Sequence, residues 1–342
     1  MNKRMTLALV FMAACGSEAA PPTAQTAGTD TPAAADPGPS SPSDPGTSAT
    51  PSNPDPTGPA KQDCSTKAAL SGDLDWTIAS KGKDRTLHVH ISTKYDSKKP
   101  TPVILNFHGF TSNGKEQATY TGMNRKADEA GFIAVHAEGI GSDKQQSWNA
   151  GACCGEAMET KIDDVALVST IIDELESKLC VDAKRVFATG MSNGGFLSHR
   201  LACDLSNRIA AVAPVAGVMG VPSCTPSRPV PVMHFHGTLD PLVPYDGVDD
   251  SDRKFPSVAK TVDDWATRNA CTDTPRSTFE TGDAKCMTRD KCAGGAEVTL
   301  CTISGGGHTW PGAFPVAVMG YTSVSIRATD AMWEFFQKHP MP

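Results

Sequence analysis

The stretch "VFATGMSNGGFLSHRLAC", residues 186–203, places a serine at the bend between two segments of different periodicity. "RVFATG", residues 185–190, predicts a buried strand, and "NGGFLSHRLAC", residues 193–203, predicts a helix. Between them "GMSNG" fits the pattern G-x-S-x-G, in which glycines at positions 190 and 194 leave room for a tight turn that exposes the serine hydroxyl. The N-terminus of the helix offers free N–H groups to a developing oxyanion. This setting favours Ser192 as a nucleophile over an ordinary turn serine.

Short apolar runs recur along the chain and alternate with stretches of helical period. We expect strands at residues 85–92, 102–109, 132–139, 185–190, 210–217, 230–237 and 296–303. Several are apolar at nearly every position, which is typical of strands buried on both faces of a mainly parallel sheet. Helices are expected at residues 161–179, with Thr160 as the N-cap, and at residues 193–203 and 323–339. The alternation predicts a three-layer α/β domain with a mainly parallel sheet flanked by helices.

The first residues of the chain form a candidate export signal. Residues 1–15, "MNKRMTLALVFMAAC", combine two basic residues with an apolar run too short to span a bilayer. The ending "MAAC" is similar to a bacterial lipobox, which predicts a lipid on Cys15 and, with Gly16 after it, an outer-membrane anchor; a plain cleaved signal is the alternative. Residues 16–62, rich in Pro, Ala, Ser and Thr, are expected to be a disordered tether. Residues 63–342 would then form the catalytic domain.

Charge and cysteine content narrow the class of protein. The formal net charge of −7 argues against a nucleic-acid partner, because binding one requires a basic face. Setting Cys15 aside leaves ten of the eleven cysteines, an even number that predicts disulfides in an exported chain. The cysteine spacings match no zinc site.

Some disulfide pairings can be anticipated. Cys153 and Cys154 are adjacent, and we expect them to bond to different partners because a vicinal bridge strains the backbone. The other expected pairs are Cys286–Cys292, which would close a small loop, and Cys203–Cys224.

A serine nucleophile needs a base and an orienting acid, which on this type of sheet follow in the order Ser, Asp or Glu, His. Asp240 comes directly after the strand expected at residues 230–237, and His308 follows the strand expected at residues 296–303. Nearby carboxylates that could take the place of the acid are Asp246, Asp249 and Asp250. The backbone N–H groups of Asn193 and Phe110 are the candidate oxyanion donors.

Other polar residues have plainer interpretations. His234 and His236 lie on one face of a strand and, with Asp240, could suggest a metal site, but we favour a role in supporting the acid loop. His108 is expected to brace the oxyanion loop. Asp163 and Asp164 are interpreted as helix-start carboxylates that complement the helix dipole.

Taken together, six blocks resemble one group of proteins. They are "FHGFTSNG", "SWNAGACCG" followed by "IDDVALV", "VDAKRVFATGMSNGGFLSHRLAC", "AAVAPVAG", "VPVMHFHGTLDPLVPY" and "GGGHTWPG". In this order they resemble exported esterases related to poly(3-hydroxybutyrate) depolymerases and to feruloyl or acetylxylan esterases, within the α/β-hydrolase fold. The resemblance implies a Ser192–His308–Asp240 triad with Phe110 and Asn193 at the oxyanion hole.

The resemblance also bears on the substrate. It places Trp148 and Trp310 at the acyl or alcohol pocket, although each could equally be a core aromatic. No appended polymer-binding module is found, and a tethered enzyme suits soluble oligomers or small esters better than solid polymer.

The expected function is that of a serine carboxylic-ester hydrolase, acting on polyhydroxybutyrate-type oligoesters or on feruloyl or acetyl esters of plant polysaccharide. Neither a metal nor an organic cofactor is implied. The expected partners are the ester substrate and a membrane, to which the lipid on Cys15 would attach the protein. The alternatives are a serine peptidase of the prolyl-oligopeptidase type and a non-catalytic surface lipoprotein.

Overall fold

Most strands of the described residues form one ten-stranded sheet whose middle consists of the uninterrupted apolar runs. In the computed structural model the described residues are 63–142, 145–250 and 253–342. From edge to edge the strands are β1 (Gly72–Ser80), β2 (Lys83–Ile91), β4 (Ile133–Ala137), β3 (Thr101–Phe107), β5 (Val181–Met191), β6 (Ala211–Val215), β7 (Val232–Gly237), β12 (Val298–Ile303), β11 (Ala284–Arg289) and β10 (Arg276–Thr281). The six strands from β4 to β12 are parallel, and the outer pairs are antiparallel. Their carboxyl ends therefore meet at one edge of the sheet.

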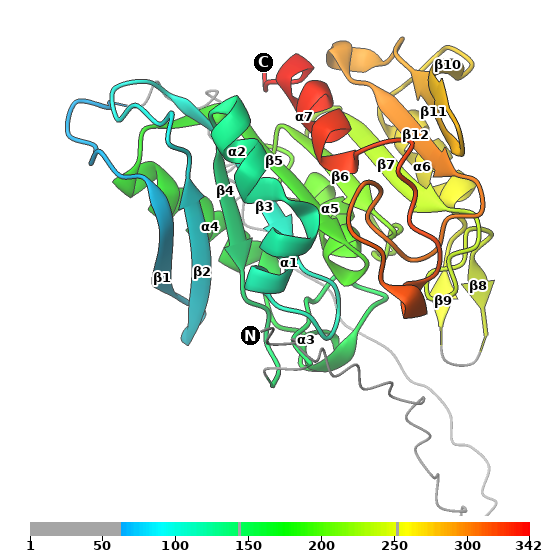
Figure 1. The fold of residues 1–342 in the computed structure, drawn as a ribbon, viewed down its shortest axis with the longest axis horizontal. Coiled ribbons are helices and arrows are strands. Elements are labelled where there is room, and N and C mark those ends of the chain that lie inside the picture. Colours follow the sequence, from blue (N-terminus) through cyan, green and yellow to red (C-terminus); the bar gives the residue numbers. More distant parts are fainter. Residues whose placement is uncertain (1–62, 143–144, 251–252) are drawn as a thin grey trace, which may run out of the picture. The chain divides into compact units, whose positions relative to one another are not determined.

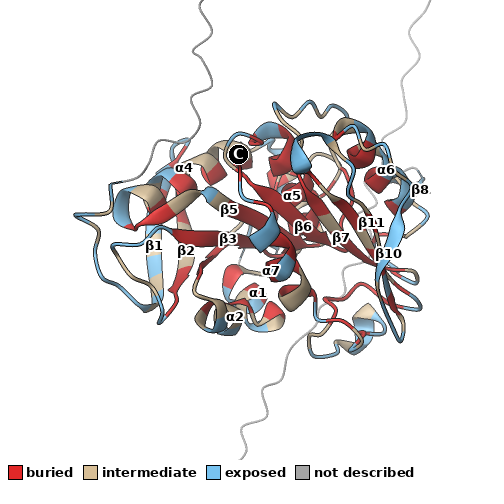
Figure 2. Ribbon diagram, turned by 90° about the horizontal axis from the view of Figure 1, so that it is seen from above, coloured by how far each residue is buried: buried red, intermediate tan, exposed pale blue. Residues whose placement is uncertain are grey.

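Helices cover both faces of the sheet, which gives three layers (Figures 1 and 2). One face packs against α4 (Asp164–Lys178), α5 (Asn193–Asp204) and α6 (Val258–Arg268), and the other against α2 (Met123–Ala130) and α7 (Ala328–Lys338). The helix α1 (Gly114–Thr121) lies beside α2 in Figure 1, and α3 (Gly155–Glu159) is a short turn before α4. A small hairpin, β8 (Val248–Asp249) with β9 (Lys254–Phe255), lies outside the main sheet. The predicted three-layer α/β architecture is confirmed.

All seven expected strands are present, and two strands that were not expected, β1 and β10, carry many polar residues. The burial of β1 alternates along its length, and β10 is exposed at nearly every position. These two strands form the edges of the sheet, where one face or both meet solvent.

Two expected helix starts are wrong. The helix α4 begins at Asp164 and is capped by Asp163, whose Oδ1 accepts the Ala166 N–H at 2.9 Å, whereas Thr160 ends α3. The aspartate is the better cap because its carboxylate reaches the first free N–H groups of the helix. The last helix begins at Ala328 and not at residue 323.

Five disulfides lie in the described region, and they correct most of the expected pairings. The Cys203–Cys224 bond is confirmed. The other bonds are Cys64–Cys180, Cys153–Cys154, Cys271–Cys292 and Cys286–Cys301. The expected Cys286–Cys292 loop is wrong because Cys286 lies directly opposite Cys301 in the register of β11 and β12. Separate partners for Cys153 and Cys154 are also wrong, since the two bond to each other across a cis peptide.

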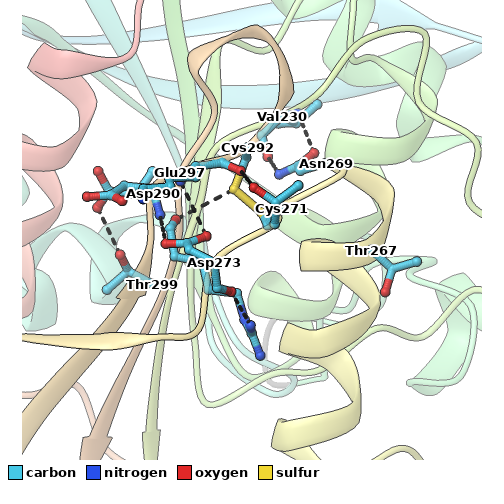
Figure 3. Close-up of a disulfide and its surroundings, with 12 residues drawn as sticks. Val230, Thr267, Asn269, Cys271, Asp273, Asp290, Cys292, Glu297 and Thr299 are labelled. Carbon is cyan, nitrogen blue, oxygen red and sulfur yellow. Dashed lines mark hydrogen bonds between the residues drawn. A yellow bond between two sulfur atoms is a disulfide. The ribbon is translucent and has the colours of Figure 1, made fainter.

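The Cys271–Cys292 bond fastens the end of α6 to the loop before β12 (Figure 3). Next to it, the Asn269 side chain accepts the Val230 N–H at 2.9 Å and donates to the Val230 carbonyl at 2.7 Å. These contacts fix the start of β7 relative to α6.

The signal peptide predicted at residues 1–15, its lipidation at Cys15 and the tether at residues 16–62 lie outside the described residues. Within the described ranges, every helix is too short or too polar to serve as a membrane span.

Candidate active site

Ser192 lies at the sharp turn between β5 and α5. Its backbone has φ 54° and ψ −122°, a left-handed conformation that costs a non-glycine residue about 1–3 kcal/mol. Its N–H donates to Val215 O at 2.9 Å, and its carbonyl accepts the Phe196 N–H at 2.9 Å, so both sides of the turn are fixed. The strained turn presents a half-buried serine at the N-terminus of α5.

Glycines around this turn allow close backbone contacts. A Cβ on Gly190 would lie 2.6 Å from Phe107 O, and a Cβ on Gly194 would collide with the same carbonyl and lie 2.7 Å from His108 O. Gly109 lies directly beside the serine, because a Cβ there would be 3.3 Å from Ser192 Cβ. The end of β3 therefore packs against the turn without room for a side chain.

Asp240 and His308 come together although 68 residues separate them. Asp240 follows β7 and His308 follows β12, and these two strands are parallel neighbours in the sheet. His308 Nδ1 lies 2.7 Å from Asp240 Oδ2, and both side chains are almost fully buried. Asp240 is thus the carboxylate that His308 contacts.

Three groups besides His308 surround the Asp240 carboxylate. Oδ1 accepts the backbone N–H groups of Leu242 at 2.9 Å and Val243 at 2.8 Å, and His236 Nε2 lies 3.4 Å from Oδ2. Burial of the carboxyl favours its neutral form, but hydrogen bonds from His236 and His308 outweigh it and lower the pKa of Asp240. The acid is therefore ionised at neutral pH.

The loop after β3 carries the candidate oxyanion donor Phe110, whose side chain is 39% exposed. Thr111 beside it has φ 71° and donates its N–H to Gln146 O at 3.1 Å. His108 braces the loop as expected: Nδ1 lies 2.8 Å from Gly109 O, and Nε2 accepts the Gly139 N–H at 3.0 Å. Burial lowers the pKa of His108 to about 4, so this ring is neutral.

The Asn193 side chain makes three hydrogen bonds to a neighbouring loop. Its Oδ1 accepts the Trp148 N–H at 2.6 Å, and its Nδ2 donates to Trp148 O at 3.0 Å and to Cys153 O at 2.8 Å. The residue after the serine thereby holds the loop that contains the Cys153–Cys154 bond. The sequence offered no signal for this role, since any residue supplies the backbone N–H.

A buried ion pair also holds this loop, at Asn149. Arg85 Nη1 lies 3.1 Å from Asp164 Oδ1, and Asp164 Oδ2 accepts the Asn149 N–H at 2.7 Å. Asp164 lies in the first turn of α4, as the interpretation of a helix-start carboxylate has it, but its side chain is also fully buried and supports the loop. Nothing in the pair "DD" distinguishes the two roles.

Trp148 and Trp310 are buried, which favours the core-aromatic interpretation of both over the interpretation as pocket residues. Their exposed fractions are 0% and 1%. Trp148 Nε1 donates to His108 O at 2.9 Å, and Trp310 Nε1 donates to Thr329 Oγ1 at 3.0 Å. Both indoles thus satisfy their polar atoms inside the protein.

The remaining histidines have structural partners. His236 Nε2 contacts Val243 O at 2.8 Å, which confirms that His236 supports the acid loop. His88 contacts Asp75 and Glu138, and His90 contacts Asp73. No group of histidine, cysteine and carboxylate side chains in residues 63–142, 145–250 and 253–342 is arranged to hold a metal ion.

Comparison with known proteins finds relatives that are named as esterases. The chain is 33% identical over 234 residues to feruloyl esterase B of Piromyces equi. The aligned region covers 66% of this chain but only 42% of that protein. It is 30% identical over 277 residues to the putative esterase NocK of Nocardia uniformis subsp. tsuyamanensis, covering 74% and 79% of the two chains. An acetyl xylan esterase from Aspergillus awamori has the same fold, with a TM-score of 0.57 and 13% identity over 78% of this chain and 100% of that one.

A family model gives the assignment directly. Residues 88–269 match the phospholipase/carboxylesterase model. This range includes β3, the turn at Ser192 and Asp240. The chain therefore belongs to the phospholipase/carboxylesterase family, a group of carboxylic ester hydrolases with the α/β-hydrolase fold.

Proposed function

We propose that this chain is a serine carboxylic-ester hydrolase in which Ser192, His308 and Asp240 form the catalytic triad. The observation that carries the proposal is the 2.7 Å contact of His308 Nδ1 with an ionised, buried Asp240. It lies at the same sheet edge as the strained Ser192 turn, because β5, β7 and β12 are all parallel.

The reaction follows from the roles of these groups. Ser192 Oγ attacks the ester carbonyl while His308 takes its proton, and Asp240 holds the imidazole tautomer and stabilises the imidazolium. The backbone N–H groups of Asn193 and Phe110 bind the oxyanion. His308 returns the proton to the leaving alcohol, and water then releases the acid from the acyl-enzyme with His308 again acting as base.

For the substrate we propose a feruloyl or acetyl ester of a saccharide, with polyhydroxybutyrate-type oligoesters as the second candidate. The relative named feruloyl esterase B supports the first. Faster hydrolysis of a hydroxybutyrate dimer than of methyl ferulate would make polyhydroxybutyrate-type oligoesters the first candidate substrate.

Export of the protein is part of the proposal. The five disulfides of the described region suit an oxidising compartment. The lipid on Cys15 and attachment to the outer membrane remain predictions from the sequence.

Labelling with a fluorophosphonate probe tests the nucleophile. We expect the wild-type protein to be labelled on Ser192, and Ser192→Ala to lose the label and at least about a thousandfold of kcat on a chromogenic acetate ester. The matched control is Ser177→Ala, because Ser177 is an exposed serine at the end of α4. Label on another serine, or retained turnover in Ser192→Ala, would refute the triad, and an unlabelled folded protein would favour a non-catalytic role.

A further inference from the structure

Three buried histidine rings contact one another in succession and end at the loop that carries Asp240. They are His199 on α5 and His234 and His236 on β7, and we call these three side chains the histidine array. Each is at most 1% exposed, and successive ring centroids are 5.4 Å and 5.2 Å apart. Trp265 of α6 contacts one end, and Asp240 lies at the other. None of these rings takes part in the acyl transfer described above.

The hydrogen bonds of the histidine array run in one direction. An indole N–H can only donate, so the 2.9 Å bond from Trp265 Nε1 makes His199 Nδ1 an acceptor and leaves the proton of that ring on Nε2. His199 Nε2 then donates to His234 Nδ1 at 3.2 Å, and His234 Nε2 donates to His236 Nδ1 at 3.0 Å. A single indole donor therefore fixes all three rings in the same tautomer.

At its far end the histidine array presents an N–H to the acid loop. His236 Nε2 lies 2.8 Å from Val243 O and 3.4 Å from Asp240 Oδ2. Val243 in turn donates its own N–H to Asp240 Oδ1 at 2.8 Å. The carboxylate is thus held on both oxygens, while Oδ2 still faces His308 Nδ1 at 2.7 Å.

The surroundings keep His199 and His234 uncharged. Burial lowers the pKa of His199 to about 3 and the pKa of His234 well below its ordinary value. A second proton on His199 would also set an N–H against the indole N–H. The charged or titratable groups that face the array are Arg268, beside Trp265, and Asp240 and Tyr245 at the other end.

We propose that Trp265 and the histidine array are positioning residues for the catalytic acid. The indole N–H at one end and the Val243 carbonyl at the other require the same tautomer in all three rings, and His236 in that tautomer orients Asp240 toward His308. This inference rests on the proposed triad. Residues of α5, β7 and α6 thus affect the rate of the reaction, although up to three rings separate them from the acid.

His234→Leu tests the proposal, because it removes the middle ring and the hydrogen bond that His236 Nδ1 accepts, so His236 is no longer held toward Asp240. We expect kcat on a chromogenic acetate ester to fall about tenfold while KM changes less than about twofold. The acid limb of the pH profile of kcat/KM should move to higher pH, since a carboxylate that accepts fewer hydrogen bonds holds the His308 proton more tightly. His234→Gln should restore both, because its amide can accept from His199 and donate to His236.

The matched control is His136→Leu. His136 on β4 is also fully buried, and burial lowers its pKa to about 3, but it contacts Asn106 and Asn124 and not the acid loop. An equal fall of kcat in both leucine variants, or a pH profile that does not move in His234→Leu, would overturn the proposal.

Nitrogen-15 NMR of the wild-type imidazoles measures the tautomers directly. It needs no substitution that could unfold the protein and no activity assay. All three rings of the histidine array should carry the proton on Nε2, and a proton on Nδ1 of any of them would refute the relay. Missing fluorophosphonate label on the wild-type protein would instead refute the triad and leave the tautomers measurable.

Discussion

Replacing Arg85 by methionine should destabilise the protein far more than an exposed charge replacement does. The Arg85 and Asp164 side chains are 4% and 0% exposed and lie 3.1 Å apart. Without the guanidinium, the Asp164 carboxylate keeps the Asn149 N–H and a weaker charge interaction with Arg200. Breaking a buried pair from one side costs about 3–5 kcal/mol, and we expect a loss of that size in the free energy of unfolding.

The loss should also depend on pH in a defined direction. Burial raises the pKa of Asp164 above its ordinary value of 3.8, and Arg85 is the main charge that opposes the rise. In Arg85→Met the pKa rises further, so above the ordinary value the folded state binds more protons than the unfolded state. Stability of the variant relative to wild type should therefore fall as pH increases from that value through the folded pKa.

Urea denaturation followed by tryptophan fluorescence, at about pH 5 and about pH 8, measures both effects. The control is Lys81→Met, because Lys81 Nζ lies 3.9 Å from Asp163 Oδ2 and the two side chains are 65% and 47% exposed. This exposed pair should contribute about 0–1 kcal/mol. Equal losses in the two variants, or a loss in Arg85→Met that shrinks as pH rises, would refute the reasoning.

Two further substitutions test the turn and a disulfide. Gly194→Ala should cost about 3 kcal/mol of stability and most of the esterase activity, because the new Cβ would collide with Phe107 O, a backbone atom that cannot move away cheaply; wild-type activity and melting temperature would contradict this. The double change Cys203→Ser and Cys224→Ser should lower the free energy of unfolding by about 3 kcal/mol, the chain-entropy value for a bond across 21 residues. Chemical denaturation checks it, and an unchanged midpoint would contradict it.

The central strands and the turn at Ser192 could be predicted because their cause is local. Strands buried on both faces, such as β3 and β6, are apolar at almost every position. A G-x-S-x-G motif between a strand and a helix likewise has its steric reason within five residues. Edge strands such as β10 carry no such pattern, because most of their side chains meet solvent.

The contacts that were not predicted depend on residues distant in sequence. Cys286 pairs with Cys301 because of the strand register, which residue spacing does not contain. Asp164 differs from Asp163 through its contacts with Asn149 and with Arg85, which lies 79 residues away. The direction of the histidine array likewise depends on Trp265, a residue of α6, and that helix was not expected from the sequence.

The two edge strands also govern how one molecule meets another. On β1 the exposed positions include Asp73 and Asp75, and on β10 they include Arg276 and Glu280. A second copy that extended the sheet at either edge would have to bury these charges or set them against their own kind. Charged edges of this type protect a sheet from edge-to-edge aggregation. The polar residues that made β1 and β10 hard to predict from the sequence thus also disfavour the pairing of these edge strands with those of a second copy.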